Sequence, residues 1–109
     1  MHKNDLAYTD HILLCIKKIR KFVKSVDKKE FAKSELLQDA IIRNFEVIGE
    51  ASKKISPEFK KANLNIPWKE ISGMRDKLIH DYLGVDIDVI WKTIESDLPV
   101  LQKELKKIK

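Results

Sequence analysis

The stretch SELLQDAIIRNFEVIGEASKKI, residues 34–55, decides the fold because it has the periodicity of a long amphipathic helix. At about 100° per residue, one face of this helix collects Leu37, Ala40, Ile41, Ile48, Ala51 and Ile55. Another face collects Asp39, Arg43, Glu46 and Glu50. Ser34, or the residue before it, can cap the start, and Ser56-Pro57 ends the helix. We therefore predict a helix with one face in the core.

The N-terminal stretch shows a second apolar stripe with spacings of three and four residues. Its members are Tyr8, Ile12, Cys15, Ile19, Phe22 and Val26. The run from Asp27 to Glu30 breaks the pattern. We predict a helix over the stripe and a loop at this run.

Two more helices are predicted in the C-terminal half. One begins at Ile66-Pro67 and ends at Gly84, and Ser72-Gly73 kinks or divides it. Asp86 caps the other helix, in which Pro99 predicts a kink or short break. The apolar face of this last helix consists of Ile87, Ile90, Trp91, Ile94, Leu98, Leu101 and Leu105. No segment has the pattern of a strand. We expect a single all-α domain over residues 1–109, an antiparallel bundle of four to five helices.

Composition narrows the cellular setting. The net charge of +5 favours an anionic partner, although lysines near the C-terminus also fit a solvated basic tail. One cysteine, Cys15, excludes a disulfide within the chain and fits a reducing compartment. The N-terminus does not have the pattern of a signal peptide, and no apolar run approaches the roughly 18 residues that span a bilayer. We expect a cytoplasmic protein without a membrane partner.

The densest group of reactive side chains is MRDKLIHDY, residues 74–82. On a regular helix Arg75 and Tyr82 lie about 20° apart, whereas Arg75 and His80 lie about 140° apart. The last two side chains converge only if the helix ends or distorts near His80, or if a second copy supplies the missing group. The spacing therefore hints at a site shared across a dimer.

These residue types suit RNA cleavage. A ribose 2′-OH can attack the neighbouring phosphate without a metal, given a base, an acid and a fixed cation. Histidine titrates near neutral pH and arginine presents a rigid fork of donors. Tyrosine can hold a phosphate oxygen or stack on a base. The alternative is that His80 is a surface residue paired with Asp76, four positions earlier.

Asn44 is unusual because it falls in the middle of an apolar helix face. A buried asparagine must be hydrogen-bonded. It either fixes packing in the core or an interface, or it orients groups of an active site. The face with Asp39, Arg43, Glu46 and Glu50 fits a metal or partner site, or a solvated surface. No established metal motif, phosphate loop or serine nucleophile motif occurs in the sequence.

The chain resembles the HepT-like proteins of the HEPN superfamily. Residues 75–82 match their Arg-x4-His-x-Tyr motif, and further similarity is carried by residues 43–51, Pro67-Trp68, residues 82–86 and the segment from Trp91 to Pro99. The resemblance spans nearly the whole chain and is weakest at residues 1–35.

The resemblance implies a homodimeric helical bundle with the motif residues at a shared cleft. It implies a metal-independent ribonuclease without a cofactor, directed at RNA such as tRNA. It also implies the toxin of a type VII toxin–antitoxin pair, silenced by an MntA-type nucleotidyltransferase that adds AMP to a tyrosine. Carried over, Arg75 and His80 are catalytic and Tyr82 is modified. The supporting or RNA-binding residues are Asn44, Arg43 and Asp76.

Two other functions fit the sequence. One is a non-catalytic helical partner that helps a nucleotidyltransferase hold its substrate. The other is a bundle that serves only in protein interaction. A non-catalytic partner would not need a titrating histidine in the motif. A bundle that serves only in protein interaction would explain neither Asn44 nor the motif.

Overall fold

The computed structural model describes residues 3–80 and 84–108, and the side chains of residues 3, 75, 79–80 and 84–85 lie outside this description. The elements in chain order are α1 (Lys3–Val23), α2 (Lys28–Lys33), α3 (Glu35–Lys54), α4 (Pro57–Ala62), α5 (Trp68–Ser72), α6 (Met74–Leu78), β1 (Ile79–His80), β2 (Gly84–Val85), α7 (Ile87–Lys92), the π-helical turn η2 (Thr93–Asp97) and α8 (Leu98–Lys106). The predicted all-α bundle is confirmed.

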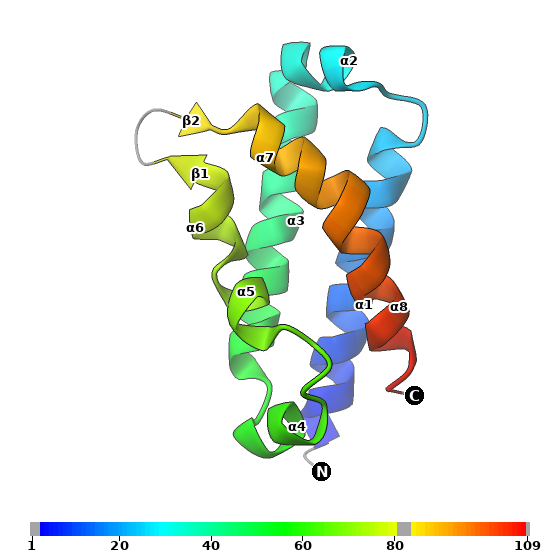
Figure 1. The fold of residues 1–109 in the computed structure, drawn as a ribbon, viewed down its shortest axis with the longest axis vertical. Helices are drawn as coiled ribbons and strands as arrows, with labels where there is room; N and C mark the ends of the chain where they lie inside the picture. Colours follow the sequence, from blue (N-terminus) through cyan, green and yellow to red (C-terminus); the bar gives the residue numbers. More distant parts are fainter. Residues whose placement is uncertain (1–2, 81–83, 109) are drawn as a thin grey trace.

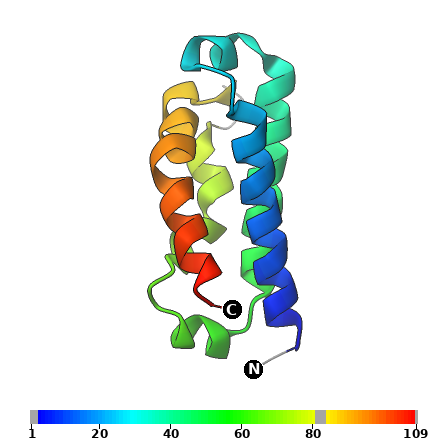
Figure 2. The ribbon, with the colours of Figure 1, turned by 90° about the vertical axis from the view of Figure 1, so that its right-hand side faces the viewer.

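The long helices α1 and α3 run antiparallel through the bundle, with α5 and α6 along one side of α3 (Figure 1). The continuous rod formed by α7, η2 and α8 packs on α1 through α8. The described chain begins and ends in the same half of the bundle, away from β1 and β2 (Figures 1 and 2). The molecule measures 43 × 29 × 19 Å along its principal axes.

The core is built from the predicted apolar faces. Of the α3 face, Ile41, Ile48, Ala51 and Ile55 are buried, and Leu37 and Ala40 are half-buried. The last predicted face also points inward, since Ile90, Ile94, Leu98, Leu101 and Leu105 are buried. Fully buried Phe31 packs against Trp91 in a tilted arrangement with ring centroids 5.4 Å apart. The periodicity therefore identified the sides of the helices that pack together.

Two predictions for the N-terminal part are wrong. The run from Asp27 to Glu30 is not a loop, because α2 begins at Lys28. The Asp27 carboxylate accepts a hydrogen bond from the Glu30 amide at 2.8 Å, and the Asp27 amide donates to the Glu30 carboxylate at 3.4 Å. This capping box stabilises a helix start within a charged run. Phe22 is 40% exposed rather than in the core, since Val23 occupies the inward position of the last turn of α1.

The region from Ile66 to Gly84 differs from a single helix. Gly73 divides it into α5 and α6, as predicted. The prediction that Gly84 ends the helix is wrong, because α6 ends at Leu78. Residues 79–80 and 84–85 then pair as short antiparallel strands, with His80 opposite Gly84, so the expected absence of strands is also wrong. The carbonyl of Leu78 accepts from the amide of Asp86 at 3.1 Å, a bond made across the two strands.

The helix is irregular before Pro99, as predicted, but it does not break there. Residues Thr93–Asp97 form a π-helical turn, in which the Leu98 amide donates to the Thr93 carbonyl five positions earlier. Proline lacks an amide donor and its ring crowds the preceding turn. The wider turn accommodates this without ending the helix. Within the described residues, no helix combines the length and apolar character needed to cross a membrane.

Candidate active site

The motif residues fall on a helix and on the strand that follows it. The backbone of Arg75 lies in α6 and the backbone of His80 lies in β1, beyond the helix end at Leu78. Tyr82 lies outside the described residues. Because the chain leaves the helix between Arg75 and His80, the separation of about 140° expected on a regular helix does not apply to them. For these side chains to converge, the helix must end or distort near His80, or a second copy must supply one of them. The helix end at Leu78 meets the first condition within a single chain.

A cavity of about 450 Å³ lies between α1, α3 and the junction of α5 and α6. Its lining includes Tyr8, His11, Arg43, Glu46, Ser72 and Asp76. The structure thus brings two of the predicted supporting residues, Arg43 and Asp76, to one cavity. Asp76 directly follows Arg75 in the sequence, so this cavity is next to the motif.

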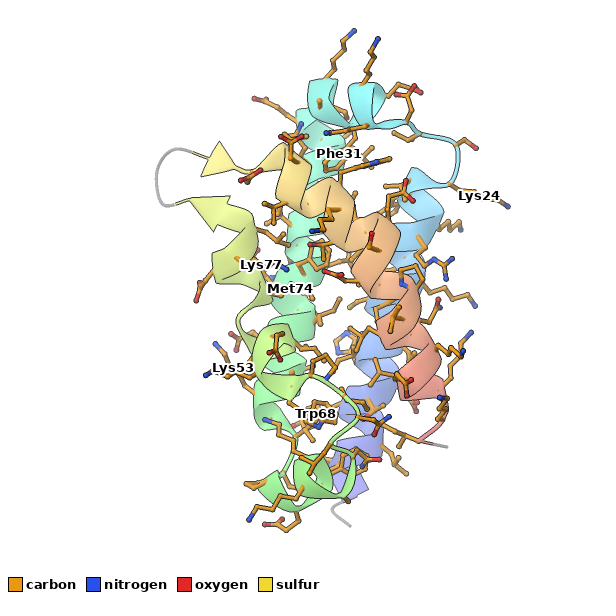
Figure 3. All side chains as sticks on the ribbon, viewed as in Figure 1. Lys24, Phe31, Lys53, Trp68, Met74 and Lys77 are labelled. Carbon is orange, nitrogen blue, oxygen red and sulfur yellow. The ribbon has the colours of Figure 1, made fainter. Side chains whose placement is uncertain are left out.

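The cavity carries charges of both signs. Lys53, which projects from α3 (Figure 3), lines it and lies 3.8 Å from the carboxylate of Glu50. Arg43 is exposed and forms no ion pair with any residue that the structure describes. Its guanidinium is therefore available for an anionic ligand. The exposed face that contains Arg43 was predicted correctly as polar, although Glu46 is half-buried.

Asn44, expected on the apolar face with its amide hydrogen-bonded, lies there only in part. It is half-buried, and its Nδ2 donates to the carbonyl of Ala40 in the same helix at 2.9 Å. This hydrogen bond satisfies the amide locally rather than across the core. The contact does not join Asn44 to the motif, and its supporting role stays a prediction.

Sequence reasoning missed two α1 residues of this cavity. Tyr8 was assigned to the core stripe, but it is half-buried and lines the cavity; His11 is exposed beside it. The two are three positions apart, so they share a helix side next to the buried stripe. This three-residue spacing is the sequence feature that could have identified them as neighbours. Ser72 was noted only as a break, yet its hydroxyl lies 3.2 Å from that of Ser52 and ties α5 to α3.

Cys15 is a buried neighbour of this region. Burial raises the pKa of its thiol, while the charges of Lys18 and Arg43 act in the opposite direction. A thiol with a raised pKa is a poor nucleophile near neutral pH. Among the described residues, no group of three or more histidine, cysteine or acidic side chains is arranged to hold a metal ion.

Comparison with known proteins identifies the family. A family model described as ribonuclease HepT-like matches residues 12–108. A "Probable ribonuclease HepT" of Thermococcus cleftensis is 40% identical over 109 residues, covering 100% of this chain and 99% of that protein. A "Putative RNase" of Caldanaerobacter subterraneus is 42% identical, covering 97% and 95%. No solved structure matches the chain significantly.

One longer relative is matched over only part of its length. The "Gamma-glutamylcyclotransferase and putative RNase" of Methanocaldococcus jannaschii is 43% identical over 108 residues, which are 99% of this chain and 49% of that protein. The fold and these matches define the class of protein, a helical ribonuclease of the HEPN superfamily. Within that superfamily, the chain belongs to the HepT-like family.

Proposed function

We propose that this chain is a metal-independent RNA endonuclease that cuts tRNA, with Arg75 and His80 as its catalytic residues. The observation that carries the proposal is the end of α6 at Leu78, between these two residues. A fixed cation and a titrating imidazole are the groups that such a reaction needs. Because the helix ends between them, Arg75 and His80 are not held on different faces of one regular helix, and they can act on the same phosphate.

The proposed reaction is an internal transfer within the RNA. The ribose 2′-oxygen attacks the adjacent phosphorus and loses its proton to a base. The bond from phosphorus to the 5′-oxygen breaks, and an acid protonates that oxygen. The products are a 2′,3′-cyclic phosphate and a free 5′-hydroxyl. His80 acts in proton transfer, and Arg75 stabilises the charge on the phosphate oxygens.

Arg43, Asp76 and Asn44 are proposed as supporting residues. Arg43 and Asp76 line the same cavity beside α6, and the Arg43 guanidinium has no ion pair among the described residues. We propose that Arg43 binds a phosphate next to the one that is cleaved. Asp76 would orient neighbouring donors, and Asn44 would support the same helix face.

Cleavage of labelled tRNA in EDTA tests the proposal. His80→Ala and Arg75→Lys should each lower the rate by about 10²–10⁴, because each removes an acid–base group or the guanidinium fork. His2→Ala removes a histidine outside the motif and serves as the matched control. The proposal fails if both motif variants cut RNA at the wild-type rate, or if EDTA abolishes cleavage.

We further propose that the chain is the toxin of a type VII pair, silenced on Tyr82 by an MntA-type nucleotidyltransferase. The Tyr82 hydroxyl attacks the α-phosphorus of ATP and loses its proton, and pyrophosphate leaves. The bound AMP adds a phosphodiester charge and a nucleoside, which compete with RNA for Arg75. A dimeric toxin in the cytoplasm fits this proposal.

The two tyrosines of the chain provide a matched test. With the nucleotidyltransferase, ATP and magnesium, wild type and Tyr8→Phe should gain one or more AMP masses, mapped to Tyr82. Tyr82→Phe should gain none and should stay active on RNA in the presence of the antitoxin. Modification at Tyr8 would contradict the assignment. A chain that binds the nucleotidyltransferase but never cuts RNA would support the alternative, a non-catalytic partner.

A further inference from the structure

The second half of α1 concentrates positive charge. Residues 17–24 contain Lys17, Lys18, Arg20, Lys21 and Lys24 and no acidic residue. Lys17, Lys21 and Lys24 are exposed and have no ion pair within the described part of the chain. Like charges placed this close repel one another. A ligand of opposite charge would relieve this repulsion.

These side chains border a groove between α1 and the rod of η2 and α8. The groove has a volume of about 800 Å³, and its lining includes Lys17, Arg20, Lys21 and Lys24. Arg20 donates a hydrogen bond to Gln102 of α8, which holds its guanidinium between the two helices. Arginine has further donors that stay available for a ligand. The basic groove, as we call it, is thus a concave surface rather than a row of separate lysines.

The lining of the basic groove is not purely cationic. Val23, Ile94 and Pro99 also line it, so apolar side chains accompany the cations, with Glu95 as an acidic member. Helix neighbours three or four positions apart are spaced by about 5–6 Å. Cations at this spacing can follow successive phosphates of a strand, while sugars and bases contact the apolar side chains of the lining. The combination favours a nucleic acid strand over a small anion.

The basic groove lies far from the motif. Lys24 points away from the bundle on the side opposite β1 and β2 (Figure 3). The bundle is 29 Å wide in this direction. This width is an upper limit for their separation, and at 3.4 Å per nucleotide along a helical strand it corresponds to at most about nine nucleotides. No described residue of α6 lines the groove, so a ligand at the groove does not fill the site next to Arg75.

We propose that the basic groove is a second binding site for the phosphate backbone of the RNA substrate, separate from the motif that cleaves it. The proposal rests on the ribonuclease function above and extends it. It predicts that affinity depends on substrate length. RNA long enough to reach both places is held by the groove, whereas a short oligonucleotide contacts the motif alone.

Binding is measured first, by fluorescence anisotropy of a labelled 20-nucleotide RNA at several salt concentrations. His80→Ala is used as the background so that the RNA stays intact. Each phosphate contact contributes about 0.7 to the slope of log affinity against log salt for a single strand. The triple variant Lys17→Ala, Lys21→Ala, Lys24→Ala should lower this slope by about 2. The matched triple Lys60→Ala, Lys61→Ala, Lys69→Ala removes equal charge elsewhere and should leave the slope unchanged.

Cleavage then separates binding from chemistry. With His80 intact, the groove triple variant should raise KM for the 20-nucleotide RNA without changing kcat, and should cut a four-nucleotide RNA like wild type. Lys→Arg at the same three positions should restore KM. The groove proposal is overturned if the slope and KM do not change, or if the variant loses affinity for the nucleotidyltransferase and not for RNA. Wild type that neither binds nor cuts RNA overturns both proposals.

Discussion

The backbone amide of Asp86 donates a hydrogen bond to the carbonyl oxygen of Leu78 at 3.1 Å. Leu78 is the last residue of α6 and is fully buried. The carboxylate of Asp86 also caps α7, because it accepts from the Val89 amide at 3.2 Å. One residue therefore fixes the end of one helix and the start of the next, and β1, with His80, lies between them.

Asp86→Ala should affect both stability and RNA cleavage. Loss of a helix N-cap costs about 0.5–2 kcal/mol of unfolding free energy. Asp27 caps α2 by a similar hydrogen bond and is remote in sequence from the motif, so Asp27→Ala is the control. Urea unfolding should give similar losses for the two variants, and only Asp86→Ala should cut RNA more slowly. Equal cleavage rates would show that the cap does not position His80.

Mixing two inactive variants tests whether the site is shared between copies. Arg75→Ala and His80→Ala are each expected to be inactive alone. If Arg75 of one copy acts with His80 of the other, a mixture that exchanges subunits should regain up to about a quarter of wild-type activity in mixed dimers that keep one intact pair. If each chain supplies its own pair, mixing restores nothing. Light scattering at micromolar concentration must first show a dimer, and a clean monomer with full activity would exclude the shared site.

Asn44→Ala should separate function from stability. The Asn44 amide donates to Ala40 within α3, and alanine has the higher helix propensity. The variant should therefore unfold within about 0.5 kcal/mol of wild type, as is usual away from a critical contact. If the variant cleaves RNA more slowly while its unfolding free energy is unchanged, the result supports a role of Asn44 at the active site. Unchanged cleavage would assign Asn44 to the helix alone.

Cys15 should make the unfolding free energy depend on pH above neutrality. Its folded pKa is raised by burial, so the unfolded chain releases the thiol proton first as the pH rises. Below the pKa of the unfolded chain, the thiol is protonated in both states and does not lower the unfolding free energy. As the pH rises from there through the folded pKa, ionisation of the unfolded chain lowers the unfolding free energy. Urea unfolding at pH 8 and pH 10 should therefore show a larger loss for wild type than for Cys15→Ala. Equal losses would assign the pH dependence to other groups.

Helix periodicity predicted the bundle because burial follows the same 3.6-residue repeat as the sequence. It failed where local hydrogen bonds oppose the pattern. The charged run at Asp27 has no apolar periodicity, yet its capping box begins a helix. The segment after Leu78 continues the apolar and charged pattern that predicted a helix. The Leu78 carbonyl nevertheless accepts a hydrogen bond from the Asp86 amide, and residues 79–80 and 84–85 pair as strands.

The candidate site was predictable only in part. The motif identified Arg75 and His80, and helix spacing placed Arg43 on an exposed face. Spacing within one helix could not show that Arg43 and Asp76 share a cavity with Tyr8 and His11, because this depends on how α1, α3 and the α5–α6 junction pack. Such contacts between distant segments are set by tertiary structure.

The position of the chain ends has a practical consequence for engineering and gene fusion. Both ends of the described chain lie in the half of the bundle away from β1 and β2 (Figure 1). An affinity tag or a fused domain at either end would start on that side and leave the strand pair uncovered. The relative from Methanocaldococcus jannaschii named gamma-glutamylcyclotransferase and putative RNase aligns with this chain over 49% of its own length.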